Sequence, residues 1–154
     1  MGEENDKKTA SGPAGDPYHL ERFVTALDAG GTYQRSLAEL RAGRKASHWM
    51  WFIFPQVAGL GLSSMAQRYA ISGLSEARAY LGHPVLGPRL RECAGAVAAV
   101  GDSTADRILG PVDAMKLRSS MTLFAAAAPE EPSFGEVLTR YFDGQPDQAT
   151  VARL

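Results

Sequence analysis

Apolar residues recur along most of this chain with the three-to-four-residue spacing of an amphipathic α-helix. Two of these stripes are Leu20, Phe23, Val24 and Leu27, and Leu86, Leu90, Cys93, Val97 and Val100. Short segments rich in Gly, Pro and Ser separate the stripes, and no run of alternating β-branched residues indicates a strand. The pattern predicts an all-α fold, a compact multihelical single domain of about eight helices.

Capping residues indicate where several helices begin. Asp16 followed by Pro17 is a typical N-cap and first-turn pair, which predicts a helix from this point. Ser133 and Glu136 have the spacing of an S-x-x-E capping box. Asp113 is expected to cap the helix 113–128, which is apolar on most faces and should therefore lie at the centre of the domain.

The first 15 residues contain no aromatic or branched aliphatic side chain. Such a segment cannot bury enough apolar surface to offset the entropy of ordering, so residues 1–15 are predicted to be a disordered tail, with one helical domain at 16–154. The tail also lacks the apolar core of a signal peptide. Because the longest apolar runs fall far short of the roughly 20 residues that span a bilayer, we expect a cytoplasmic protein without membrane association.

The most apolar stretch is WMWFIF at 49–54, which contains both tryptophans. As a strand it would need burial on both faces, and the chain offers no partner strands. It is therefore expected to form a short buried helix or irregular segment, capped by Ser47 and ending before Pro55. Most of it should belong to the core, with its cationic end at the rim of any site.

The composition is that of an ordinary globular protein, with 45% hydrophobic and 21% charged residues and a net charge of −1. No overall field attracts the chain to nucleic acid, although Arg35, Arg41, Arg44 and Lys45 cluster modestly. The single Cys93 cannot form an internal disulfide and lies on an apolar stripe, so we expect it in the core.

The histidines, His19, His48 and His83, lack the paired spacing of metal ligands. The sequence also lacks the glycine-rich phosphate loop, the H-E-x-x-H zinc motif, the C-x-x-C pair and the G-x-S-x-G nucleophile motif. We therefore expect no metal site and no cofactor.

The first candidate binding pattern is Arg44, Lys45 and His48 leading into Trp49 and Trp51. Cations beside aromatic faces can hold a planar anionic ligand through charge and stacking. The alternative interpretation is that the tryptophans only fill the core, and that the two cations follow the C-terminus of a helix.

The second pattern is GLGLSS at 59–64, where Ser63 and Ser64 would stand at the start of a helix. Free N–H groups at a helix start attract phosphate or carboxylate. An ordinary loop with a serine cap explains the same residues.

The third pattern is Lys116, Ser119 and Ser120, which share one face of a helix. A lysine desolvated by an apolar helix can lose its proton and activate a serine. The alternative is a lysine that extends to solvent, with serines that allow close helix packing.

Six blocks of the sequence resemble the bacterial domain-of-unknown-function family 1810. They are DPYHLERF at 16–23, GRKASHWMWFIFPQVAGLGLSS at 43–64, RYAI at 68–71, EARAYLGHPVLGPRL at 76–90, ILGPVDAMKLRSSMTLF at 108–124 and the pair Tyr141-Phe142. The match covers nearly all of 16–154. The resemblance implies a compact, multihelical single domain and no established reaction.

Because the three patterns coincide with the distinctive blocks, we predict that they converge on a pocket between the HWMW segment (48–51) and the KLRSS helix (116–120). The pocket would bind or process a small anionic ligand that resembles a nucleotide or a phosphosugar. The catalytic candidates are His48, Lys116, Ser119 and Ser120, and the ligand-binding candidates are Arg44, Lys45, Trp49, Trp51, Gln56, Ser63 and Ser64. The alternative function is a protein-interaction module without catalysis, and the oligomeric state stays open.

Overall fold

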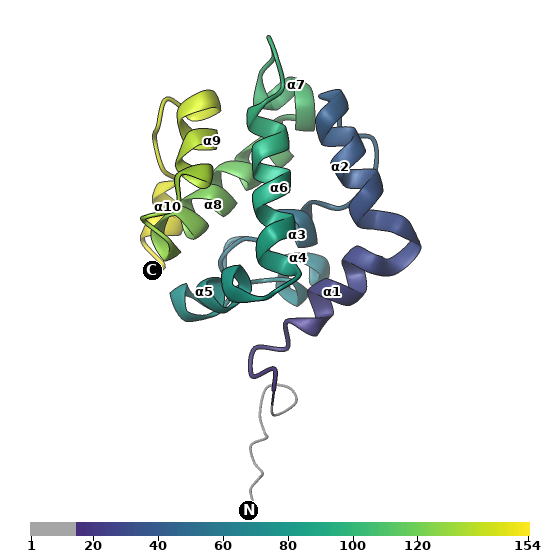
Figure 1. The fold of residues 1–154 in the computed structure, drawn as a ribbon. Coiled ribbons are helices and arrows are strands. Elements are labelled where there is room, and N and C mark those ends of the chain that lie inside the picture. The colour runs from purple at the N-terminus through teal and green to yellow at the C-terminus, as the bar shows by residue number, and fades with distance from the viewer. Residues whose placement is uncertain (1–14) are drawn as a thin grey trace, which may run out of the picture.

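The computed structural model describes residues 15–154, and the regular secondary structure of this part of the chain is helical, without a β-sheet (Figure 1). The elements are α1 (Glu21–Asp28), η2 (Ala29–Gly31), α2 (Thr32–Ala42), α3 (Met50–Ile53), α4 (Ser64–Arg68), α5 (Leu74–Gly82), α6 (Leu86–Ala98), α7 (Ala105–Leu109), α8 (Pro111–Ala127), α9 (Pro132–Phe142) and α10 (Gln148–Val151). The predicted all-α fold class is confirmed. The disordered tail predicted for 1–15 lies, up to residue 14, outside the described residues.

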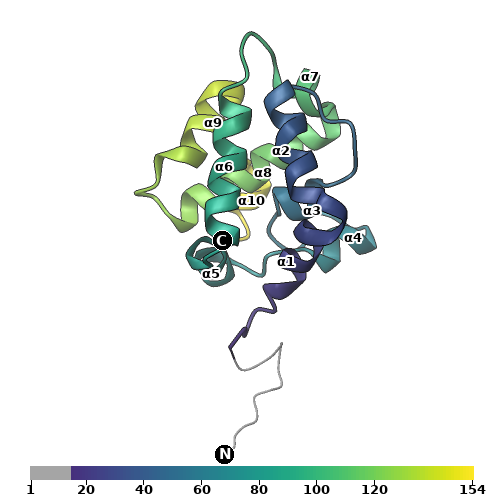
Figure 2. The same cartoon turned by 45° about the vertical axis from the view of Figure 1, so that its right-hand side comes forward.

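Helix α8 forms the centre of the domain. The six consecutive residues 119–124 are all buried, so neighbours surround this part of the helix on every side. Helices α5, α7, α9 and α10 pack against it, and in Figure 2 it lies behind α6. The prediction that 113–128 is central is therefore confirmed.

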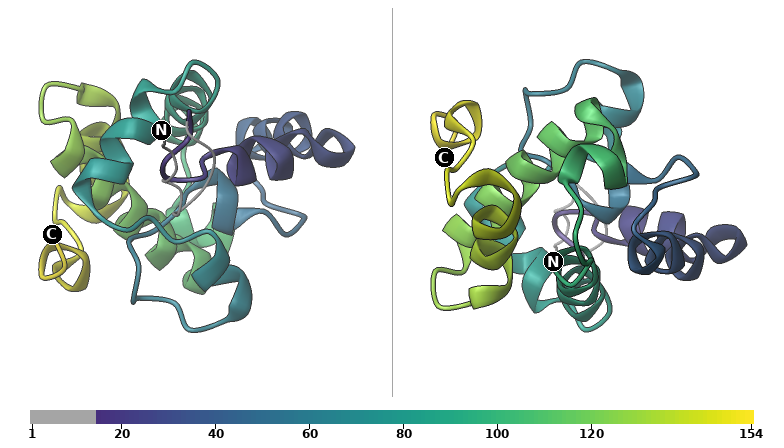
Figure 3. Two further views of the ribbon diagram at one scale, coloured as in Figure 1. Left: turned by 90° about the horizontal axis from the view of Figure 1, so that it is seen from below. Right: turned by 90° about the horizontal axis from the view of Figure 1, so that it is seen from above.

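Helix α6 forms a second packing centre, against α2, α5 and α9. Its predicted stripe is buried from Leu86 to Val97, as the spacing indicates. A Cβ atom on Gly87 would lie only 2.1 Å from the carbonyl oxygen of Leu81, so a glycine at this position allows α5 and α6 to approach closely. Figure 3 shows α1 and α2 on one side of the domain and α9 and α10 on the other.

A single pair of strand-like contacts closes the loop that carries α4. The amide of Ala58 donates to the carbonyl of Ile71 at 2.8 Å, and the amide of Ile71 donates to the carbonyl of Gln56 at 2.9 Å. These bonds make an isolated parallel bridge between Val57 and Ile71. We call this bridge the neck, because the chain between its two sides leaves the core and returns to it.

The first helix begins later than its capping signal predicts. The carboxylate of Asp16 accepts the amide protons of Leu20 at 2.7 Å and Glu21 at 2.9 Å, as a cap would, yet α1 begins only at Glu21. His19 has a φ of +53°, in the left-handed region, which interrupts any helix that starts at Pro17. The predicted start at Asp16-Pro17 is therefore wrong, although Asp16 is a capping residue.

Two other capping predictions are also wrong. Ser133 does not form a capping box with Glu136, because its hydroxyl donates to Glu131 Oε2 at 2.7 Å and α9 has already begun one residue earlier. Helix α8 begins at Pro111, so Asp113 lies within its first turn. In both cases proline at the first helical position sets the start.

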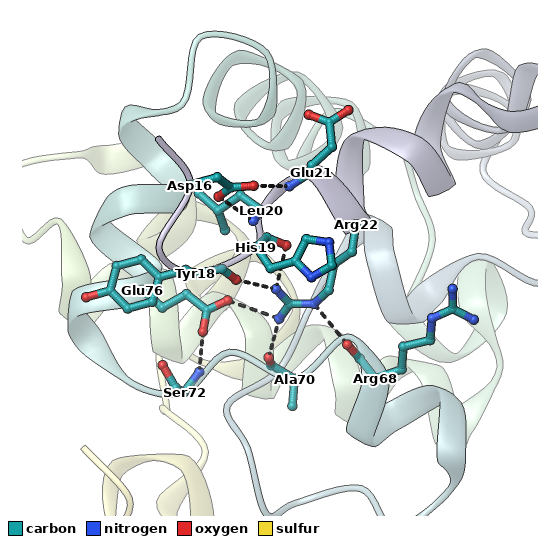
Figure 4. Close-up of polar contacts among 10 residues, drawn as sticks. All are labelled: Asp16, Tyr18, His19, Leu20, Glu21, Arg22, Arg68, Ala70, Ser72 and Glu76. Carbon is teal, nitrogen blue, oxygen red and sulfur yellow. Dashed lines mark hydrogen bonds and ion pairs between the residues drawn. The ribbon is translucent and has the colours of Figure 1, made fainter. Parts of the chain in front are cut away.

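Arg22 joins three segments of the chain with all five of its N–H donors (Figure 4). Its acceptors, at 2.7–3.0 Å, are the carbonyl oxygens of Tyr18, His19, Arg68 and Ala70 and the Glu76 carboxylate. Glu76 is also buried and accepts the amide proton of Ser72 at 2.9 Å, at the start of α5. The guanidinium therefore fastens the entry of α1 to the end of α4 and to α5.

Replacing Arg22 by Met keeps an apolar stem but leaves the Glu76 carboxylate buried without its cation. We expect the free energy of unfolding to fall by about 3–5 kcal/mol, in line with removal of one partner from a buried ion pair. Urea unfolding followed by circular dichroism measures the change. Arg107→Met is the matched control, because Arg107 is exposed on α7 and its side chain has no partner within residues 15–154. Equal midpoints for the two variants would contradict the prediction.

Candidate functional site

A narrow cleft lies between α3, the loop 57–63, α4 and α8. Its lining residues are Met50, Trp51, Phe54, Gln56, Val57, Gly59, Gly61, Ala66, Tyr69, Ala70 and Lys116. We call it the Trp51 cleft. The cavity volume is about 10 Å³, room for roughly one water molecule. The structure thus brings together the HWMW segment, the GLGLSS loop and Lys116, but around a space that admits only a small group.

Two lysines share one carboxylate at the edge of this cleft. The Nζ atom of Lys45 lies 3.1 Å from Asp113 Oδ2, and that of Lys116 lies 3.5 Å from Asp113 Oδ1. Each ammonium also lies over an indole ring, Lys45 over Trp49 at 5.3 Å and Lys116 over Trp51 at 5.7 Å. Two positive charges therefore face one negative charge, which leaves the cluster with a net charge of +1.

The two tryptophans have different environments. Trp49 is fully buried, and its Nε1–H donates to Glu39 Oε1 at 2.8 Å. Trp51 is only half-buried, and its ring lines the cleft. The core interpretation therefore describes Trp49, whereas Trp51 offers an aromatic surface to a ligand.

Glu39, on α2, fixes the segment that leads into α3. Its carboxylate accepts hydrogen bonds from the amides of Ala46 at 2.7 Å and Ser47 at 3.1 Å, the Ser47 hydroxyl at 2.6 Å and the Trp49 indole. Burial alone would raise the pKa of Glu39, but these bonds, with that of the Ser47 hydroxyl first, outweigh it and lower the pKa to about 2. Ser47 was predicted to cap α3, which is wrong, because its hydroxyl binds Glu39 and the N-cap position is Trp49.

Several of the predicted site residues lie outside the lining. Arg44 and His48 are exposed, and neither side chain has a hydrogen-bond or ion-pair partner within residues 15–154. Ser63 accepts the amide proton of Ala66 at 3.1 Å and caps α4, as one of the two interpretations proposes, and Ser64 is exposed. Helix α4 has only five residues, so its start has a weak dipole and little to offer an anion.

Within residues 15–154 no hydrogen bond joins Lys116 to Ser119 or Ser120. The Ser119 Oγ atom lies 3.1 Å from Asp147 Oδ2 and 3.2 Å from the carbonyl of Met115, so this hydroxyl fastens α10. Ser120 is fully buried, and its Oγ atom has no hydrogen-bond partner in the described part of the chain. Because no hydrogen bond joins either serine to Lys116, the geometry does not support a lysine-activated serine.

Sequence reasoning missed Asp113 and Glu39 as parts of the site. Asp113 was interpreted only as a helix cap, although its i, i+3 spacing to Lys116 was a signal for an ion pair. Glu39 gave no local signal, because its partners follow seven to ten positions later on a different segment.

Cys93 belongs to the hydrophobic core. Burial raises the pKa of the Cys93 thiol to about 12, so the thiol stays protonated and acts as a core residue. Within residues 15–154 no three His, Cys, Asp or Glu side chains are arranged to hold a metal ion. None of the helices described above is long and apolar enough to cross a bilayer.

The chain belongs to the family described as protein of unknown function DUF1810, whose model matches residues 17–154. It is also similar to the conserved hypothetical protein Rv1873 from Mycobacterium tuberculosis, whose crystal structure was solved at 1.38 Å. The two chains are 52% identical, the match covers 90% of this chain and 98% of that one, and the TM-score is 0.87. No curated protein matches the sequence. The family resemblance noted in the sequence is therefore confirmed.

Replacing Glu39 by Gln should lower the free energy of unfolding at neutral pH by about 1–3 kcal/mol, because hydrogen bonds to a charged acceptor are weakened. Folding lowers the pKa of Glu39, so its contribution is complete above the unfolded pKa of about 4.3 and is lost as the pH falls towards 2. The difference in free energy of unfolding between wild type and Glu39→Gln should therefore decrease as the pH falls below about 5. Urea unfolding at stepped pH measures it, with the exposed Glu136→Gln as control. A gap that stays constant with pH would contradict the prediction.

The two serines of α8 should respond differently to replacement by alanine. Ser119→Ala removes a bond to Asp147 and should destabilise the fold by about 1 kcal/mol, whereas Ser120→Ala removes an unsatisfied buried hydroxyl and should be neutral or stabilising. Thermal unfolding of the pair measures the difference. Equal destabilisation by both substitutions would show that Ser120 has a partner in solution.

Proposed function

We propose that the Trp51 cleft binds the anionic group of a small ligand, such as a nucleotide or a sugar phosphate. The observation that carries the proposal is that a cation, an aromatic face and a glycine-lined backbone meet in one cleft, supplied by Lys116, Trp51 and the pair Gly59 and Gly61. Lys116 comes from a segment far from the other two in sequence, whereas Trp51 and the two glycines lie within one stretch of the chain. Their chemistry is that of an anion contact beside a stacking surface.

The charge balance favours an anion near Lys116. Lys45 makes the closer contact with Asp113, at 3.1 Å against 3.5 Å for Lys116. Lys116 has three N–H donors and one loosely held counter-ion, so it retains donors for an incoming oxyanion. A phosphate or carboxylate at this point would bring the negative charge into balance with the two lysines.

Neighbouring groups would orient the uncharged part of the ligand. The Trp51 ring provides a face on which a planar ring can stack. The amide side chain of Gln56, in the same cleft, has no hydrogen-bond partner within residues 15–154 and can bond a polar ring edge. No group in this arrangement is poised to break a bond, so the function that it supports is binding.

The small volume of the cleft sets a condition on this function. A ligand must lie at the mouth, or the segment 59–67 must move outward. Gly59 has a φ of +96°, Leu62 is 82% exposed and α4 contains no buried residue. The side-chain hydrogen bonds made by residues 59–67 stay within this segment, for example from Ala66 to Ser63 and from Gln67 to Leu62. Opening of the segment with the neck closed requires Leu60 and Met65, which pack against the core, to leave it, but breaks none of these side-chain hydrogen bonds.

A protein-interaction surface is the second candidate function. Val112 and Met115, in the first turns of α8, are each 68% exposed, and Leu62 lies on the loop that borders the cleft. Large apolar side chains at the surface favour contact with another protein when they lie together. Loss of a binding partner or of self-association in Met115→Ser, with small-ligand binding unchanged, would favour this candidate.

Titration of tryptophan fluorescence tests the proposed binding. AMP and ribose 5-phosphate should quench wild type, and adenosine, which has no phosphate, should bind more weakly. Trp51→Phe leaves only the buried Trp49 and should show no response. Lys116→Met should weaken AMP binding by about tenfold or more, because it removes a charged hydrogen bond.

Arg107→Met is the control and should bind as wild type does, since Arg107 lies on α7, outside the cleft lining. A thermal-shift series with the same ligands provides an independent readout, because a ligand that binds the folded state raises the melting temperature. No shift and no quenching with any of the phosphates would refute the proposal.

A further inference from the structure

We infer that Arg153 is the second anion-binding residue of the Trp51 cleft and gives it a preference for ligands with two linked phosphates, such as a diphosphate. This inference rests on the proposed function and extends it. It assigns a role in binding to a residue at the end of the chain, more than 30 positions from Lys116 in sequence. Three observations support it: the position of the guanidinium, its lack of partners, and the way in which its helix is held.

The guanidinium of Arg153 lies beside Gly59, a residue of the cleft lining, although Arg153 is not itself among the lining residues. A Cβ atom placed on Gly59 would be only 2.4 Å from Arg153 Nη1 and 2.8 Å from Cζ. Gly59 is itself a lining residue. A side chain at position 59 would occupy the place of the guanidinium, so the glycine leaves space for this cation. Glycine also tolerates the positive φ that the backbone adopts at this position.

The Arg153 side chain is without a partner in the described part of the chain. It makes no hydrogen bond and no ion pair there, although it rests on backbone. Arg22 and Arg140 use their donors internally: Arg22 bonds four carbonyls and Glu76, and Arg140 bonds the carbonyls of Val100 and Gly101 at 2.8 Å. Arg44 and Arg107, like Arg153, have no side-chain partner in the described residues, but neither is among the atoms found next to Gly59. The planar donors of Arg153 are therefore available to an oxyanion, which they can bind in a bidentate manner.

Burial of apolar surface does not explain why α10 is where it is. Its only buried residue is Thr150, and Val151 is 45% exposed. The helix is held instead by polar contacts around Asp147, whose carboxylate accepts hydrogen bonds from the Thr150 amide at 3.0 Å and from the Ser119 hydroxyl at 3.1 Å. A short helix that adds little to the core but is fastened at defined points is suited to positioning Arg153, two residues beyond its end.

Helix α8 carries Lys116, and it also holds the C-terminal segment that carries Arg153. Lys116 lines the cleft, and the next turns of the same helix hold the C-terminal segment. Arg118 donates to the carbonyls of Gln145 at 2.9 Å and Pro146 at 3.2 Å, and Thr122 Oγ1 accepts the Asp147 amide proton at 2.9 Å. The two cations thus come from separate elements and could each contact one of two linked anionic groups.

Binding of inorganic phosphate and of pyrophosphate, measured by calorimetry, tests the inference. Wild type should bind pyrophosphate about tenfold or more tightly than phosphate, because a second charged contact forms. Arg153→Gln should weaken pyrophosphate binding about tenfold and should leave phosphate binding nearly unchanged. Lys116→Met should weaken both ligands. Arg153→Lys should recover part of the lost affinity, since it keeps the charge but not the planar donors.

Arg107→Gln is the matched control and should have no effect, because Arg107 is an exposed arginine on α7 and, unlike Arg153, is not among the atoms next to the lining residue Gly59. Arg153 is exposed, so its replacement should leave thermal unfolding unchanged. If Lys116→Met weakens binding and Arg153→Gln does not, the inference about Arg153 fails while the proposed function stands. If wild type binds neither anion and none of the ligands tested on the cleft, both fail.

Discussion

The structure depends on the burial of the central part of α8, because the polar groups of an enclosed helix need partners inside the fold; the Ser120 hydroxyl is the exception among the described residues. Residues 119–124 are buried without interruption, yet the helix bears lysine, arginine, serine and threonine side chains. Lys116 meets Asp113 and Trp51, Arg118 meets two carbonyls, and Thr122 meets the Asp147 amide. The partners of Arg118 and Thr122 lie in the C-terminal segment, which adds little to the core. The hydrogen bonds that the polar groups of α8 require therefore fix the position of that segment.

The same principle explains the irregular segments around the cleft. The connections between helices cannot satisfy their own backbone groups as a helix does, so those groups need partners from elsewhere. Arg22 donates to four carbonyls in loops or at helix ends, and Glu39 accepts from two loop amides. These two charged side chains therefore make the backbone hydrogen bonds that a regular helix would make for itself. Both arrangements hold segments that adjoin the cleft, which gives it walls of defined position in a region with little helix.

Sequence patterns predicted those features that depend on near neighbours along the chain. The stripes of α6 and the apolar character of α8 follow from spacing alone, and the structure confirms both. Predictions failed where a distant group competes with a local signal. Ser47 has the pattern of a cap but bonds Glu39, and Ser133 has the pattern of a capping box but bonds Glu131. For the site, the sequence indicated which blocks would meet, but it could not indicate that Ser119 turns towards Asp147 or that Arg153 reaches Gly59.

The neck between Val57 and Ile71 closes the loop at its base. The stability of the domain should therefore depend little on how long the loop is. Closing a flexible loop becomes less favourable only with the logarithm of its length, by about 0.6 kcal/mol for each doubling. The tip at Leu62 points into solvent, and the two hydrogen bonds at the base do not involve it. This position is therefore a natural point for inserting a reporter sequence, and for lengthening by evolution, without disturbing the helices beneath.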